Sequence, residues 1–576
     1  MDAVRDRARA LGTKVHARLT KPSSWILPRE ESSIAPPGVW SNKDYDPVEA
    51  ERRTWTSTTI ATYWFSDLVS IVGWSQAAAM YRVGLSATDA TLACMVAGIC
   101  IGVPTGRATF PVSPSSSTTL RRLVLSGSIG ASLHIPFPVA IRASYGMYLY
   151  YFCVVSRGIL ALFWFGIHSV YADLPNHLPP SAAITTKGMV SYVVYQALQF
   201  PFLFVPPHKL KYLFRAKVVL LPPVVMGMAI WIAVKADGGN EFFYQPPRLQ
   251  GSERAWQWLS GMTSVTGGCS TLCLNISDWA RFSKRPKTQW WQVFLIPAFL
   301  TAMGVCGIVG ASASQKLWGE ALWNPLNIVD RWTDTPGGRA AAFFCSVMWM
   351  LAQISINLST NSIAYATDLG SLVPKFLNIR RASIVGFLIG GWALCPWIIL
   401  KSAETFLNFM SAYAVFMAPM TGILLCDYYL VHRRRYDVPA LYNPKGIYHY
   451  KASAIVMTKR RVLETNSLQY GINWRALLVT IVTVAPLLPG IAQATNNTPI
   501  SLGAQHLYTF NWLYCFFVSL VSYFVLSKVW PAKETMIPET VPGIVDESVG
   551  VEEGVQEEKL NKVLNKSVNE TVEARV

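Results

Sequence analysis

The recurrence of apolar runs about 20 residues long, separated by polar connections, is the feature that most constrains this chain. A helix rises about 1.5 Å per residue, so a run of about 20 residues crosses roughly 30 Å of hydrocarbon. Charged residues make up only 14% of the sequence, against about 25% in soluble domains. The sequence therefore predicts an all-α polytopic membrane protein and argues against a soluble enzyme. The twelve predicted spans are 58–81, 89–103, 145–170, 189–205, 216–234, 257–277, 290–310, 340–367, 382–400, 403–431, 475–493 and 507–527.

The distribution of basic residues predicts how the spans are oriented. Forty of the 50 Lys and Arg residues lie in the two tails and the even-numbered connections, and nine lie in the odd-numbered connections. Because Lys and Arg are retained on the cytoplasmic side, both termini are predicted to be cytoplasmic. This sorting accounts for the net charge of +17 without a nucleic-acid partner. The ten cysteines show no metal-site spacing, so neither a metal nor a cofactor is expected.

Two spans carry glycines and hydroxyls where a membrane helix is usually apolar. The first span contains Gly73 among polar residues, and the sixth contains the pair Gly267 and Gly268. Paired interruptions at corresponding places mark the binding site of a transporter, because only a cavity, an ion or a substrate satisfies the freed backbone groups. Close helix packing is the alternative explanation for each glycine. Five spans separate the two interruptions, which favours two inverted repeats followed by two extra helices.

The resulting division of the chain has five parts. They are a cytoplasmic tail 1–57, a first repeat 58–234, a second repeat 257–431, helices eleven and twelve within 475–527, and an acidic cytoplasmic tail 528–576.

Polar residues in the third and eighth spans repeat at helical spacing. Gln353, Asn357 and Asn361 are four residues apart and share one helical face. Such a stripe faces either another helix, as a hydrogen-bond ladder, or a ligand. In the third span Trp164 and His168 likewise share a face, with an indole to stack on a flat ring and an imidazole to bond its edge. Arg157 lies two turns earlier on that face, at membrane depth.

These motifs resemble the nucleobase-cation symporters of the first type, on the fungal branch of uracil, uridine and allantoin permeases. The resemblance covers roughly residues 40–530 and implies a LeuT-like fold, alternating access and cation-driven uptake of a planar heterocycle at the plasma membrane. The stretches that carry it are 134–139, 142–146, 164–167, 275–282, 352–361 and 427–431.

The resemblance also assigns a substrate site. The position matching Trp164 stacks on the substrate in this family, and the position matching Asn361 hydrogen-bonds to it. Gly267 and Gly268 match the segment whose backbone approaches the ring, and Cys269 stands where members often have an aromatic residue. His168 departs from the glutamine usual in relatives, which leaves the identity of the substrate open.

A cation site between the first and eighth spans is implied in the same way. Its backbone and hydroxyl ligands would come from Gly73, Gln76, Ala352 and Ser355, but the remaining hydroxyl position is Ile356. Because one oxygen ligand is missing, proton coupling is favoured over sodium, with Asp67 as the carboxylate that binds the proton. Asp278 and Asp368 are predicted to pair with basic residues such as Lys284.

The second span contains an anomaly. Residues 106–123 are polar and separate two apolar pieces, and deleting them would restore one continuous helix from Ala93 to Ile129. We interpret them as an insertion of eighteen residues, such as an unspliced intron in the gene model. If the insertion is genuine, the product is a transport-inactive chain.

The tails suggest regulation and gating. Lys559, Lys562 and Lys566 in the acidic tail would accept ubiquitin from a ligase, and Asp46 would latch a cytoplasmic gate together with Lys284 and Asp368. No phosphate-binding loop of the GxxxxGK type is present, so direct ATP drive is not expected. A thiamine or nicotinamide riboside permease of the same fold is the alternative to a nucleobase permease. A channel or a membrane enzyme fits less well, since neither a continuous polar pore nor a paired nucleophile and base is visible.

Overall fold

The computed structural model describes residues 25–27, 34–36, 43–105, 107–108, 123–124, 126–167, 186–237, 248–394, 397, 403–450 and 471–544. Nearly all of this chain is helical. The α-helices are α2 (Ser57–Leu68), α3 (Ile71–Arg82), α4 (Ala87–Thr105), α5 (Ser126–Leu133), α6 (Phe137–Tyr145), α7 (Tyr150–Ile167), α8 (Thr186–Gln199), α9 (Lys211–Lys235), α11 (Gly251–Ser270), α12 (Leu272–Ala280), α13 (Gln292–Trp318), α14 (Pro325–Asp330), α15 (Pro336–Ile356), α16 (Ile363–Leu372), α17 (Ile379–Leu388), α18 (Ala403–Leu425), α19 (Trp474–Val484), α20 (Leu488–Asn496), α21 (Leu502–Thr509) and α22 (Asn511–Val529).

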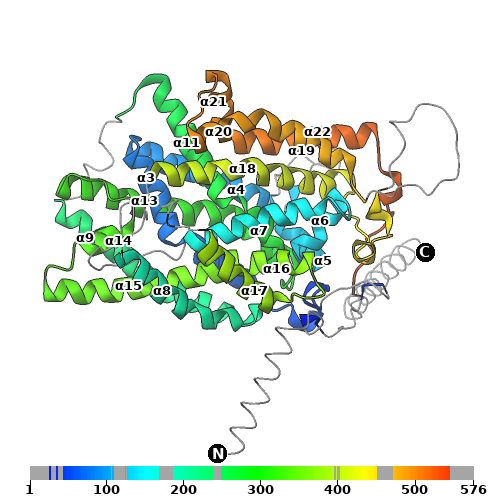
Figure 1. Ribbon diagram of the computed structural model, residues 1–576, viewed down its shortest axis with the longest axis horizontal. Helices are drawn as coiled ribbons and strands as arrows, with labels where there is room; N and C mark the ends of the chain where they lie inside the picture. Colours follow the sequence, from blue (N-terminus) through cyan, green and yellow to red (C-terminus); the bar gives the residue numbers. More distant parts are fainter. Residues whose placement is uncertain are drawn as a thin grey trace, which may run out of the picture.

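The long helices lie side by side in a bundle. Figure 1 shows α13, α18 and α22 running along the long axis of the molecule. Contacts are densest between α13 and its neighbours α4 and α3, and between α18 and both α22 and α11. Seven of the described helical segments are long and apolar enough by themselves to cross a membrane. The other predicted spans fall on shorter or interrupted helices, so the predicted count of twelve is compatible with the structure.

The first predicted span is broken at two residues, Val69 and Ser70. Both adopt extended backbone angles, with ψ of 90° at Val69 and φ of −153° at Ser70, and they separate α2 from α3. The Ser70 side chain caps α3, because its hydroxyl accepts a hydrogen bond from the amide of Gly73 at 3.2 Å. The interruption predicted from the polarity of this span is therefore present. It lies three residues before Gly73, and a serine cap produces it.

The predicted interruption at Gly267 and Gly268 in the sixth span is wrong. Helix α11 continues through both glycines to Ser270, and only Thr271, with helical angles of −60° and −30°, separates it from α12. A Cβ on Gly267 would lie 2.1 Å from the carbonyl oxygen of Met410 on α18. The glycine therefore allows α11 and α18 to approach closely, which is the packing explanation that the sequence left open.

The two pieces of the second span meet at their ends. The Ser126 hydroxyl at the start of α5 donates to the carbonyl oxygen of Pro104 in α4 at 3.1 Å. With residues 106–123 removed, Ser126 would follow Pro104 by four positions, the spacing at which a helical serine bonds back to a carbonyl. Near the two ends of residues 106–123, strands β1 (Arg107–Ala108) and β2 (Leu123–Val124) pair antiparallel. This geometry is the one expected of an eighteen-residue insertion into a continuous helix.

Deleting residues 106–123 is expected to leave surface abundance and thermal stability at least equal to those of the full chain, because α4 and α5 already meet in helical register. Surface biotinylation would measure the surface abundance, and fluorescence-detected size-exclusion chromatography of tagged, heated protein would measure the thermal stability. A deletion one residue shorter is the control, since it rotates α5 by about 100° relative to α4. If the eighteen-residue deletion loses more folded protein than this control, the interpretation as an insertion fails.

Residues 43–56 cover one end of the bundle, at the right of Figure 1, which we call the N-terminal face. The amide of Trp55 donates to the carbonyl of Phe282 at 2.9 Å, and the amide of Lys284 donates to the carbonyl of Trp55 at 3.0 Å. The Asp44 carboxylate accepts from the amide of Ile379 at 3.2 Å. This segment therefore joins the end of α12 to the start of α17.

Candidate functional site

A small cavity lies where α2 gives way to α3. The space between the atoms of its wall is about 430 Å³, part of which is open to solvent. Helices α2, α3, α7, α11, α12, α13 and α15 and the π-helical segment η8 (Asn357–Ser362) contribute residues to its wall. The lining residues are Asp67, Leu68, Ser70, Val72, Gly73, Gln76, Trp164, Gly268, Cys269, Thr271, Leu272, Leu300, Ile356, Thr360 and Asn361.

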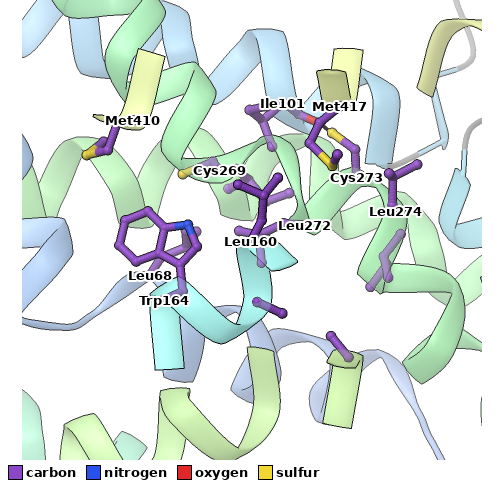
Figure 2. Packing of buried hydrophobic residues seen from close by; sticks show 14 of the residues in the cluster. Leu68, Ile101, Leu160, Trp164, Cys269, Leu272, Cys273, Leu274, Met410 and Met417 are labelled. Carbon is purple, nitrogen blue, oxygen red and sulfur yellow. Dashed lines mark hydrogen bonds between the residues drawn. The ribbon is translucent and has the colours of Figure 1, made fainter. Parts of the chain in front are cut away.

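Trp164 supplies the aromatic surface of this cavity. In Figure 2 its indole projects from α7 beside Leu68, with Cys269 and Leu272 beyond, and all four residues line the cavity. The indole N–H donates to the hydroxyl of Tyr413 at 2.7 Å. That bond fixes the ring by its edge, so the ring contributes its apolar faces to recognition.

Three polar side chains of α2, α3 and η8 reach the same space. The Asp67 carboxylate accepts from the hydroxyl of Ser359 at 2.5 Å and is 4% exposed. Gln76 is 2% exposed, and its Oε1 has no hydrogen-bond partner among the described residues. Gly268 makes room for that amide, because a Cβ there would lie 2.8 Å from the Gln76 Nε2. Asn361 completes the polar wall, with its Nδ2 donating to Asn357 Oδ1 at 2.9 Å.

The predicted substrate residues separate into three groups. Trp164, Gly268, Cys269 and Asn361 meet at the cavity. Gly267 is buried against α18 and does not line it. His168 lies outside the described residues.

The predicted cation residues divide between two places. Asp67, Gly73 and Gln76 line the cavity. Ala352 and Ser355, on α15, face α2 instead, where the hydroxyls of Ser66 and Ser355 share a hydrogen bond of 2.8 Å. On α2, the carbonyl oxygen that lies near that of Ala352 belongs to Ser66, because both oxygens accept a hydrogen bond from the same ammonium group.

A lysine occupies this contact between α2 and α15. The ammonium of Lys217, on α9, donates to the carbonyl oxygen of Ser66 and, at 3.2 Å, to that of Ala352. The Lys217 side chain is completely buried. Its positive charge therefore stands between the carbonyl oxygens of two helices.

Lys217 is not among the predicted site residues, because in the sequence it follows directly on the basic residues of the fourth connection. The feature of the sequence that identifies it is its spacing from apolar residues along α9. Lys217 follows buried Phe214 by three residues and precedes buried Leu221 by four, so it lies on the face that packs into the bundle.

Arg157 joins three helices between the cavity and the N-terminal face. Its guanidinium donates from Nε to Asp368 on α16 at 2.7 Å and from Nη1 to Asp278 on α12 at 2.9 Å, and Nη2 makes a second bond to Asp368. All three side chains are at most 1% exposed. The amide of Phe137 also donates to Asp278, at 2.8 Å.

Asp278 and Asp368 pair with a basic residue, as predicted, but that residue is Arg157 and not Lys284, the example named. The Lys284 side chain is exposed, and only its backbone amide bonds the N-terminal segment. Asp46 is 8% exposed and lines a second, larger cavity at the N-terminal face, beside Arg281. Of the three predicted gate residues, Asp46 and Lys284 therefore belong to the N-terminal face, and Asp368 is held by Arg157.

Comparison with known proteins identifies the family. A family model described as a permease for cytosine/purines, uracil, thiamine and allantoin matches residues 116–514. The chain belongs to this permease family. An uncharacterised permease of Schizosaccharomyces pombe is 31% identical over 87% of the chain and 86% of its own length. The uracil permease of Saccharomyces cerevisiae is 29% identical over 85% of the chain and 76% of its own length. The relatives are permeases, so this permease is a membrane transporter and not an enzyme.

The fold agrees with the family. Mhp1, a nucleobase-cation-symport-1 family transporter solved in a closed conformation with bromovinylhydantoin bound, superposes with a TM-score of 0.62 at 19% identity. The match covers 86% of this permease and 97% of Mhp1. The predicted fold class, an all-α membrane protein of LeuT-like architecture, is confirmed.

Proposed function

We propose that this permease imports a small planar heterocycle of the nucleobase class by proton symport. The observation that carries the proposal is the cavity at the break between α2 and α3, which combines an indole face with the amides of Gln76 and Asn361. A flat ring with N–H and C=O groups on its edge satisfies both kinds of surface. Relatives named uracil, allantoin and uridine permeases, 27–30% identical, support this substrate class.

Proton coupling is supported by the ammonium of Lys217. Its bonds to the carbonyl oxygens of Ser66 and Ala352 use oxygens that a sodium ion between the same helices would need. Asp67, whose charge interacts with that of Lys217, is then the carboxylate that binds the transported proton. Protonation of Asp67 removes this attraction, which links proton binding to the contact between α2 and α15.

The orientation and the domains follow from the same proposal. Residues 58–234 and 257–431 form two inverted repeats, and substrate and proton together stabilise an occluded state before one bundle rocks against the other. The N-terminal face is cytoplasmic, the membrane is the plasma membrane, and the lysines of the acidic tail are sites for a ubiquitin ligase.

A permease for a cationic ring is the second candidate. Asp67 places a carboxylate in the cavity wall, which would favour a positively charged substrate. Relatives named thiamine transporter and nicotinamide riboside transporter are each 28% identical.

Uptake in a yeast strain that lacks its own permeases separates these candidates. Radiolabelled uracil, uridine, allantoin, uric acid, thiamine and nicotinamide riboside would each be offered at one concentration. We expect saturable, concentrative uptake of a neutral ring that a protonophore abolishes. Uptake of a cationic ring would support the second candidate, and no uptake of any compound would refute both.

Trp164→Ala and Asn361→Ala are each expected to raise the KM of uptake by about 5- to 150-fold, the equivalent of about 1–3 kcal/mol for a lost stacking contact or a lost hydrogen bond. Surface abundance should stay unchanged. Trp291→Ala is the control, since this tryptophan is 56% exposed on the outside of the bundle. Normal KM values in both cavity variants would contradict the site.

A further inference from the structure

Three basic residues stand close together in the connection between α12 and α13. Lys284, Arg285 and Lys287 are all exposed, and none of them forms an ion pair with another described residue. The sequence contains no acidic residue between Asp278 and Glu320. The three positive charges are therefore not compensated within this connection, and we call residues 284–287 the basic turn.

A buried hydrogen bond holds the basic turn in place. The Gln289 Nε2 donates to the hydroxyl of Ser283 at 2.9 Å, and both side chains are completely buried. This bond joins the two ends of the connection, so the basic side chains between them stay at the surface. Because the backbone of the turn is already fixed, binding of a partner orders less of the chain than it would in a free loop.

Two exposed aromatic side chains follow at the start of α13. Trp291 is 56% exposed and Phe294 is 68% exposed, and a separation of three residues places them on one side of the helix. They belong to Pro286–Trp318, an apolar helical segment long enough to cross a membrane. Basic groups at the end of such a segment, with aromatic rings at the next level, are typical of the zone where lipid headgroups meet acyl chains.

We propose that the basic turn and the exposed aromatic side of α13 together bind an anionic phospholipid. The charged headgroup pairs with the three basic side chains, and the acyl chains lie against Trp291 and Phe294. A zwitterionic lipid has no net charge to compensate three cations, so the surface distinguishes phosphatidylserine from phosphatidylcholine. The basic turn lies at the N-terminal face, which is the face proposed to be cytoplasmic, and the cytoplasmic leaflet is the one rich in anionic lipid.

The basic turn is also joined to the N-terminal segment. The amide of Lys284 donates to the carbonyl oxygen of Trp55 at 3.0 Å, and the amide of Trp55 donates to the carbonyl oxygen of Phe282 at 2.9 Å. A lipid that holds the turn therefore stabilises this end of the bundle. Because a ligand that binds only the folded state raises its stability, thermal stability measures the binding.

The test uses the purified full-length permease in detergent, so it depends neither on the substrate nor on the orientation in the membrane. Its thermal midpoint would be measured while phosphatidylserine or phosphatidylcholine is titrated into the micelles. We expect phosphatidylserine to raise the midpoint saturably and phosphatidylcholine to leave it unchanged. Combining Lys284→Gln, Arg285→Gln and Lys287→Gln should weaken the apparent affinity for phosphatidylserine by about fivefold per charge, or about 100-fold in all.

The matched control combines Arg433→Gln, Arg434→Gln and Arg435→Gln, three exposed arginines just after α18 and its π-helical end. It changes the net charge by the same amount, but no large apolar side chain is exposed among the described residues 403–450. Its affinity for phosphatidylserine should equal that of the wild type. In the wild type, 1 M sodium chloride should remove most of the stabilisation, because the Debye length falls to about 3 Å. This last measurement needs no variant to fold.

Equal stabilisation of the wild type by the two lipids would overturn the inference, and so would an unchanged affinity in the variant of the basic turn. Equal loss in the arginine control would overturn it as well, since net charge alone would then attract the lipid. Glycerophosphoserine, the headgroup without acyl chains, should not shift the midpoint at the same concentrations. An equal shift with this compound would identify a site for a free anion in place of a lipid surface.

Discussion

Arg157→Met is expected to remove most of the folded permease from the cell surface. Arg157 forms ion pairs with two carboxylates, Asp278 and Asp368, at a place where all three side chains are at most 1% exposed. Removing one partner of a buried ionic cluster costs about 3–5 kcal/mol, because the remaining charges stay buried without compensation. Folded proteins are stable by only about 5–15 kcal/mol. Surface abundance and the thermal stability of the detergent-solubilised protein would measure the loss.

Two further variants isolate the cause. Arg82→Met breaks an exposed ion pair with Glu320, whose side chains are 39% and 52% exposed, and should cost about 0–1 kcal/mol. Combining Arg157→Met with Asp278→Asn and Asp368→Asn removes the uncompensated charges and should recover much of the folded protein. Wild-type stability of Arg157→Met alone would show that the cluster is not needed for the fold.

The helical framework could be predicted from the sequence, because the length of an apolar run is set by the membrane and not by distant contacts. The predicted ranges fall on helices throughout the described parts of the chain. The break in the first span was also predicted, although its position was not. A serine cap at Ser70 ends the extended segment, and Gly73, which suggested the break, is the first-turn residue that donates to it.

The glycine pair in the sixth span shows that local sequence does not decide whether a membrane helix breaks at a glycine. Glycine permits a break and also permits close packing, and only the neighbouring helix decides between them. Gly267 lies against the Met410 carbonyl, 143 positions along the chain, so packing prevails and α11 continues.

Some residues of the candidate site could also be predicted from the sequence, and others could not. Trp164 and Asn361 were found through their helical spacing and a family resemblance, Cys269 through the resemblance alone, and Asp67 as the carboxylate of the first span. The partners of Arg157 were not found, because the two aspartates lie 121 and 211 residues away in sequence. A buried arginine indicates that acids are nearby without identifying which ones.

Lys217→Met is expected to abolish accumulation of substrate against its gradient. Coupling to one proton allows about 100-fold accumulation for a pH difference of two units, and a potential of 100 mV adds about 2.3 kcal/mol, or about 50-fold. The product is about 5,000-fold. If Lys217 links proton binding to the contact between Ser66 and Ala352, its replacement reduces the accumulation ratio to about one. Steady-state internal and external concentrations of the labelled substrate would measure this ratio.

Methionine is the appropriate replacement because its unbranched apolar chain fits the buried path of the lysine stem and carries no charge. Lys235→Met, at the exposed end of the same helix, is the matched control and should accumulate substrate as wild type does. Asp67→Asn combined with Lys217→Met removes both charges from the bundle. If Lys217→Met alone fails because it leaves a buried charge that destabilises the fold, the double variant recovers folded protein; if it fails because coupling is lost, the double variant still does not accumulate substrate. Accumulation that persists in Lys217→Met and still collapses with a protonophore would place the coupling proton elsewhere. The carbonyl oxygens of Ser66 and Ala352 would then be a structural contact only.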